Sequence, residues 1–132
     1  MTIPPKSGDD FAGLAAAAAA LQTEVLAIQE VDHNLARTND ANQCANIALA
    51  MGASDWAFAP GIIGSPEGKW RNAGAKIISN KESDSEVESG SYGIGIISKI
   101  KVLQWHRLDL GRSLIGAPLL IPNTETGKAK AI

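Results

Sequence analysis

Two segments in the first half of the chain carry apolar residues at helical spacing. Residues from about Asp10 to Gln22 are predicted to form a helix, because apolar side chains recur there every three or four positions. The centre of this segment, residues 15–20, is a run of alanine, the best helix former. A second helix is predicted for Ala41–Met51, capped by Asn39 or Asp40 and followed by Gly52, which favours a left-handed C-cap. Its buried stripe is expected to consist of Cys44, Ile47, Ala48 and Met51.

Two short apolar runs have the composition of buried strands. Val25–Gln29 is bounded by polar residues and is predicted to be a strand that is buried on both faces. Tyr92–Ser98 combines isoleucine with glycines, which favour close approach of another backbone. Weaker strand patterns cover Trp56–Ala59, which is expected to stop at Pro60–Gly61, together with Ala75–Ser79 and Lys101–Leu108.

Polar connections separate these elements. Asp32–Arg37 is expected to be a loop, and the acidic, serine-rich stretch Lys81–Ser89 is expected to be a solvated one. The segment from Gly111 onward has no clear element, although its last five residues are similar to the beginning of a strand. The order of helices and strands predicts an α/β fold class, as part of a layered α/β sandwich with a mixed β-sheet.

The bulk composition narrows the class of protein. A length of 132 residues corresponds to one domain, residues 1–132, and 45% hydrophobic residues with 20% charged residues are typical of a globular protein. The net charge of -2 gives no electrostatic footprint for nucleic acid. A bound cation would still allow a phosphate site, because it brings its own positive charge.

The sequence shows no targeting or membrane signal. The N-terminal residues lack a basic region before the alanine run, and the longest apolar run, Leu14–Leu21, is far too short to span a membrane. Cys44 is a single cysteine, so no intrachain disulfide forms, and we expect it to be a small buried helix residue. These features predict a cytoplasmic protein without a membrane span.

Candidate chemistry gathers around the first predicted strand. Glu30 follows this strand, and a carboxylate at the carboxyl end of a parallel-type strand points into the crevice where α/β sheets bind ligands. Mg²⁺ commonly takes one or two carboxylates together with waters and substrate phosphates. Glu30 is therefore a candidate metal ligand, and a solvated strand-end carboxylate is the alternative.

Two motifs together resemble a known superfamily. The first is Gln-Glu-Val-Asp at residues 29–32, preceded by a helix and an apolar strand, and the second is Tyr-Gly-Ile-Gly-Ile-Ile-Ser-Lys at residues 92–99. This combination resembles the endonuclease/exonuclease/phosphatase superfamily, which has the deoxyribonuclease-I-like fold and also includes sphingomyelinases and inositol-polyphosphate phosphatases. The resemblance covers about residues 10–105 and is closest to the N-terminal part of bacterial members.

The resemblance implies a metal-dependent phosphoester hydrolase of unknown substrate. It implies Glu30 as the metal ligand, Mg²⁺ or Mn²⁺ as the cofactor, and a phosphoester substrate, with nucleic acid among the candidates although the charge does not indicate it. Arg37 and Tyr92 are candidate phosphate contacts; the alternatives are that Arg37 pairs with Asp32 and that Tyr92 only packs at the start of its strand. The two histidines, His33 and His106, form no metal motif and are not expected to be catalytic.

The same resemblance implies parts that this sequence lacks. Superfamily members open with a strand that ends in a metal-site asparagine, and later carry an aspartate-x-asparagine turn and an aspartate–histidine pair; none of these is present. We therefore expect the domain to be incomplete at both ends and the 132-residue chain alone to be inactive. The alternative function is a non-catalytic remnant or a partner-dependent binding piece, whose partner would be the missing half of its own domain.

Overall fold

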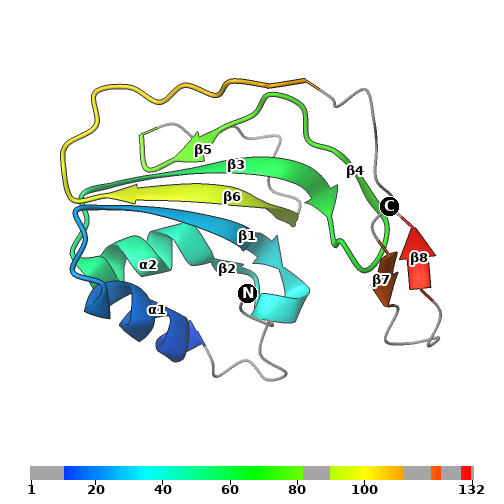
Figure 1. Cartoon of the computed structure of the whole chain (residues 1–132), viewed down its shortest axis with the longest axis horizontal. Coiled ribbons are helices and arrows are strands. Elements are labelled where there is room, and N and C mark those ends of the chain that lie inside the picture. The colour runs from blue at the N-terminus through cyan, green and yellow to red at the C-terminus, as the bar shows by residue number, and fades with distance from the viewer. Residues whose placement is uncertain (1–10, 82–89, 112–119, 123–128, 132) are drawn as a thin grey trace.

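The computed structural model describes residues 11–81, 90–111, 120–122 and 129–131 (Figure 1). Its helices are α1 (Phe11–Ala20) and α2 (Gln43–Met51), with a short 3₁₀ helix, η1 (Ala36–Thr38). The strands, in chain order, are β1 (Val25–Leu35), β2 (Ala41–Asn42), β3 (Asp55–Gly64), β4 (Trp70–Asn72), β5 (Ile78–Ser79), β6 (Ser91–Ser98), β7 (Leu120–Pro122) and β8 (Ala129–Ala131). None of the helices in these residues is long and apolar enough to cross a membrane.

The main sheet has the order β2-β1-β6-β3-β4, and β5 also pairs with β3. The predicted α/β fold class is confirmed by this sheet and its two helices. The predicted mixed sheet is not observed, because every strand pairing among the described residues is antiparallel. The physical reason is that β6 inserts between β1 and β3. These two strands, joined through α2, run in the same direction but do not pair with each other.

Both helices pack on one face of the sheet (Figure 1). The predicted stripe of α2 is confirmed: Cys44, Ile47, Ala48 and Met51 are its buried residues. The Asn42 side chain accepts a hydrogen bond from the Ala45 amide and caps the helix, so the prediction of Asn39 or Asp40 as the cap was wrong by two or three residues.

The core under the helices has two parts. Ile97, which is fully buried, packs with Ala18, Ile47 and Met51, and Phe58 packs with Val31, Cys44 and Ile78. Gly95 lies where a side chain would collide with the Cys44 sulfur, at 2.4 Å from an added Cβ. The glycine in this strand therefore lets α2 pack closely on the sheet.

Two predicted strand ends and one predicted strand were wrong. β1 continues to Leu35 through the stretch that was expected to be a loop, because its polar residues find partners inside the fold. β3 passes through Pro60, which is tolerated because the register shifts between Pro60 and Ile62 and no strand pairs with Pro60 on its other side. Lys101–Leu108 forms no strand at all.

The remaining predictions on this part of the chain have mixed outcomes. Tyr92–Ser98 is confirmed as a strand, β5 covers the end of the predicted Ala75–Ser79, and β8 occupies the predicted strand start near the C-terminus, whereas β4 and β7 were missed. Most of the predicted loop Lys81–Ser89 lies outside the described residues.

The face of the sheet opposite to the two helices is partly exposed. Cross-strand partners share a face, so Ala27, Ile96 and Ala57 lie side by side on this face, where Ala57 is buried and Ala27 and Ile96 are exposed. Val25, Ile94 and Ile96 are 48%, 56% and 41% exposed there. The expectation that the first strand is buried on both faces was therefore wrong, and the layered-sandwich part of the prediction stays a prediction. We call this surface the open face.

One end of the sheet is held together by a buried carboxylate. Asp55 accepts hydrogen bonds from the Val102 amide (3.0 Å), the Ser54 hydroxyl (3.1 Å) and the Asn80 amide (3.4 Å), and it pairs with Lys81 at 2.9 Å. The Val102 amide and the Lys81 ammonium hold the pKa of Asp55 well below its ordinary value. This cluster ties the chain after β6 to the start of β3.

Candidate functional site

Glu30 occupies a β-bulge in the middle of β1, not the end of the strand as predicted. Ile28 pairs with Gly95 and Val31 pairs with Gly93, so that Gln29 and Glu30 together stand opposite Ile94. Glu30 has a φ of 57°, in the left-handed region that a glycine normally supplies in such a bulge. A non-glycine residue in this conformation stores strain of order 1 kcal/mol, and such strain is concentrated at functional sites.

The bulge has a clear consequence for packing. Strict alternation would place Val31 on the face opposite to Ile28, but the extra residue brings both onto the helix-covered face, where both pack against Phe58 or its neighbours. After the bulge, Asp32 and its partner Tyr92 lie on the open face. The bulge therefore moves Asp32 to the side of the sheet that carries the exposed aliphatic residues.

The Glu30 side chain is exposed and makes no hydrogen bond or ion pair with any other described residue. Burial raises the pKa of the nearby Tyr92 hydroxyl above its ordinary value, the Glu30 carboxylate raises it further, and Arg37 opposes this shift. Glu30 and Tyr92 are thus electrostatic neighbours, as expected from the pairing of their strands. Glu30 does not line either of the two grooves described below.

Asp32 and Arg37 form a bidentate ion pair. Arg37 Nε donates to Asp32 Oδ2 at 2.8 Å, and Nη2 donates to Oδ1 at 2.7 Å, while the Asp32 side chain is only 3% exposed. The hydrogen bond to Asp32 raises the pKa of Arg37 above its ordinary value. This geometry favours the alternative in which the pair fixes the turn from β1 into η1.

The remaining nitrogen of Arg37 is held by a residue that the sequence did not single out. Nη1 donates to Glu67 Oε1 at 2.9 Å, and the Glu67 side chain is 60% exposed. The guanidinium carbon lies 5.4 Å from the centroid of the Tyr92 ring, within the range of a cation–π contact. Arg37 can contact a phosphate only if Glu67 gives up this position. The signal for Glu67 is its place in a glycine-rich hairpin, which is too general to have identified it.

A magnesium-type ion fits Glu30 only as one ligand among several. No group of three or more His, Cys, Asp or Glu side chains in the described part of the chain is arranged to hold a metal. Asp32 is engaged by Arg37, whereas the Glu30 carboxylate beside Tyr92 has no such pairing among the described residues. One carboxylate suits Mg²⁺ when waters and substrate phosphates complete the shell.

Neither histidine joins Glu30. His33 is 7% exposed and stacks on Phe58 with ring centroids 5.4 Å apart, and burial lowers its pKa below the ordinary value. Its Nδ1 atom and the hydroxyl of its cross-strand partner Ser91 are buried and have no hydrogen-bond partner among the described residues. His106 is exposed in the segment after β6. The prediction that both histidines lack a catalytic role remains a prediction.

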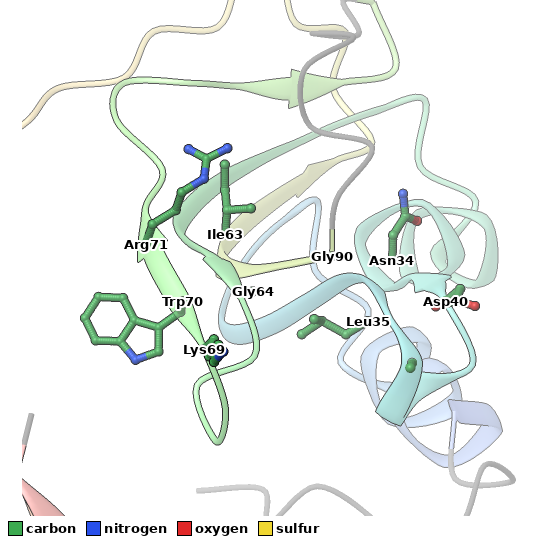
Figure 2. A pocket seen from close by; sticks show the side chains of 10 residues that line it. Asn34, Leu35, Asp40, Ile63, Gly64, Lys69, Trp70, Arg71 and Gly90 are labelled. Carbon is green, nitrogen blue, oxygen red and sulfur yellow. The ribbon is translucent and has the colours of Figure 1, made fainter.

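Two shallow grooves lie beside the sheet. The larger, of about 560 Å³, is shown in Figure 2; Leu35 and Ile63 form its floor, Asp40 and Asn34 one wall, and Lys69 and Arg71 the other. The smaller, of about 240 Å³, lies between Ile94 on the open face and residues 107–110. Arg107 anchors this segment through hydrogen bonds to the Pro60 and Lys76 carbonyl oxygens, at 2.8 and 3.0 Å.

Comparison of the chain with models of protein families, with curated proteins and with solved structures finds no match.

Proposed function

We propose that this chain contributes the metal-binding carboxylate, Glu30, of a metal-dependent phosphoester hydrolase. The observation that supports the proposal most is the conformation of Glu30. A strained, exposed carboxylate without a partner among the described residues sits in a bulge of the central sheet, where glycine would cost less. Other non-glycine residues also have a positive φ, but Glu30 combines this conformation with a bulge of the central sheet and a position beside Tyr92.

The surroundings of Glu30 suit a phosphoester. A bound magnesium or manganese ion would supply a Lewis acid that polarises the phosphoryl group. Tyr92, next to Glu30, offers a hydroxyl that donates to a phosphate oxygen, and its raised pKa keeps that proton on the hydroxyl at neutral pH. Arg37 and Asp32 hold the turn beside Tyr92 in place, and Arg37 becomes a phosphate contact if the substrate displaces Glu67.

The proposal is tested most directly by manganese binding, since Mn²⁺ broadens the NMR signals of nearby amides. In the 132-residue chain, broadening is expected to centre on Glu30, Val31 and Tyr92 and to be lost in Glu30→Gln. Glu24→Gln is the matched control, because Glu24 is an exposed carboxylate just before the same strand. Broadening that persists in Glu30→Gln, or that centres elsewhere, contradicts the assignment of Glu30.

An activity assay complements this experiment. No group of three or more His, Cys, Asp or Glu side chains among the described residues is placed to hold the ion, and groups of this kind act together. We therefore expect the 132-residue chain to hydrolyse a generic phosphodiester or phosphomonoester no faster than Glu30→Ala, with Mg²⁺ or Mn²⁺ present. Metal-dependent turnover that disappears in Glu30→Ala would show that the chain already contains the whole apparatus.

The open face supports the second candidate function, a partner-dependent binding piece. Val25, Ile94 and Ile96 expose aliphatic surface on adjacent strands, and contiguous apolar surface of this kind is typical of a contact with another protein element. This function and the first are compatible, since a covering element on this face would also enclose the surroundings of Tyr92.

A further inference from the structure

The edge strand β4 carries an exposed tryptophan between two cations. Trp70 is 42% exposed, and Lys69 and Arg71 on either side of it are also exposed. Neither cation makes an ion pair with another described residue. Because β4 is the last strand of the sheet, a ligand can approach these residues from the edge and reach both faces.

The register shows which way these side chains point. Tyr92 pairs with Ile62, and Ile62 pairs with Asn72, so Asn72 shares the open face with Tyr92. Trp70 lies two residues from Asn72, so its ring faces the same way, whereas Arg71 faces the larger groove, whose lining also includes Trp70. Figure 2 shows this division: the Trp70 ring lies on the opposite side of the β4 ribbon from Ile63 and Leu35.

Local charge around β4 differs from that of the whole chain. The cations at β4 are Lys69 and Arg71, whereas the nearby carboxylate of Glu67 is already paired with Arg37. The first 60 residues have the opposite balance, with acidic side chains in excess. The net charge of -2 therefore conceals a cationic β4 wall of the larger groove, opposite the wall that carries Asp40.

We infer that the β4 edge is a binding site for single-stranded nucleic acid, with a base stacked on Trp70 and the phosphates beside it held by Lys69 and Arg71. Proteins that bind single strands without sequence preference stack successive bases on aromatic side chains. Positively charged residues beside these aromatic rings bind the phosphate backbone. Gly64, the cross-strand partner of Trp70, has no side chain to cover the ring.

This inference deepens the proposed function, on which it rests for the identity of the phosphoester. Trp70 lies two strands away from Tyr92 on the same face, about 10 Å across the sheet. A strand bound at Trp70 would place a phosphodiester within a few nucleotides of Tyr92 and Glu30. Binding at β4 itself needs no metal, so it is measurable in a chelator whether or not Glu30 holds an ion.

The test is binding of a fluorescently labelled oligothymidylate to the 132-residue chain in EDTA, followed by anisotropy at several salt concentrations. Trp70→Leu removes the aromatic face but keeps an apolar side chain, and it is expected to weaken binding about ten-fold, while Trp70→Phe keeps most of the affinity. Lys69→Gln/Arg71→Gln is expected to lower the slope of log K against log salt by about 0.7 for each phosphate that the variant no longer neutralises.

The matched control is Lys99→Gln/Lys101→Gln, which removes two exposed cations from the opposite end of the sheet and leaves the fold and the affinity unchanged. Circular dichroism on each variant confirms that it is folded. Absence of binding at low salt, equal losses in the control and in Lys69→Gln/Arg71→Gln, or unchanged affinity in Trp70→Leu overturns the inference. So does preferential binding to anionic phospholipid vesicles over the oligonucleotide. Failure here leaves the manganese experiment on Glu30 intact.

Discussion

The two ends of the central sheet each contain a buried aspartate, and the two aspartates differ in their hydrogen-bond and ion-pair partners. At the start of β3, Asp55 receives three hydrogen bonds and a lysine, and these hold segments distant in sequence together. At the other end, the partner of the Asp32 carboxylate among the described residues is Arg37, and the strained Glu30 beside it has no partner there. The hydrogen-bonding capacity of Asp55 is filled at the first end, whereas the second end has the Glu30 carboxylate, which is unpaired among the described residues, and the partly exposed guanidinium of Arg37. Binding chemistry is therefore expected at the second end.

Removing the saturated carboxylate is expected to have the largest effect on stability. Asp55→Ala leaves the Val102 amide, the Asn80 amide and the Lys81 ammonium without their acceptor at the same time. Of all the variants proposed for this chain, it should unfold at the lowest urea concentration. Asp109→Ala, at an exposed aspartate, is the control and should unfold with the parent chain. A transition of Asp55→Ala close to that of the parent chain would mean that this cluster does not hold the sheet end together.

The second largest loss of stability is expected when the Asp32–Arg37 pair is broken by replacing Arg37. Arg37→Met keeps the length of the side chain but leaves the Asp32 carboxylate buried and unpaired, which costs on the order of 3 kcal/mol. Urea denaturation measures the loss. Glu67→Gln removes only the exposed partner of Arg37, so it should cost less than about 1 kcal/mol. Similar losses for the two variants would remove the distinction between a fixed pair and a displaceable one.

The buried His33 is expected to make the folded chain less stable at acidic pH. Burial lowers the pKa of His33 in the folded state, so below the unfolded pKa of about 6.5 the unfolded chain binds a proton that the folded chain resists. Stability contributed by neutral His33 is therefore complete above about pH 6.5 and is lost as the pH falls towards the folded pKa. His33→Phe, which keeps the stacking on Phe58, should lose less stability between pH 7 and pH 5 than the parent chain. Parallel losses in both proteins would show that other groups account for the acid sensitivity.

Relieving the strain at Glu30 is expected to give a small gain. Glu30→Gly suits the left-handed conformation and should stabilise the chain by about 1 kcal/mol while abolishing manganese broadening around Tyr92. Gln22→Gly is the matched control, since Gln22 is also exposed and has a φ of 51°; it should gain similar stability and keep the manganese effect. A loss of stability in Glu30→Gly would mean that the Glu30 side chain supports the fold, which would weaken the argument from strain.

Local sequence patterns were sufficient to predict a helix or strand wherever the preferences of its own residues define it. The stripe of α2, the left-handed cap at Gly52 and the strand Tyr92–Ser98 follow from periodicity and from the preferences of glycine, and all three are present. The two motifs of the resemblance lie on β1 and β6, and these strands pair with each other. The identity of Glu30 as the residue of interest likewise came from the sequence.

Only the tertiary structure decided what lies around these residues. β1 runs on through Asp32 because Arg37 pairs with the Asp32 carboxylate and the Gln43 side chain accepts a hydrogen bond from the Asp32 amide. The Asp32–Arg37 pair was one of the alternatives that the sequence offered, whereas the contact with Gln43 was not anticipated from the sequence. The bulge at Glu30 allows Ile28 and Val31 to pack together on the helix-covered face. It forms against β6, a strand that is distant from β1 in the sequence. Sequence patterns report the preferences of each segment, whereas register, partner choice and the open face depend on how distant segments pair, and those pairings placed the exposed Glu30 beside Tyr92.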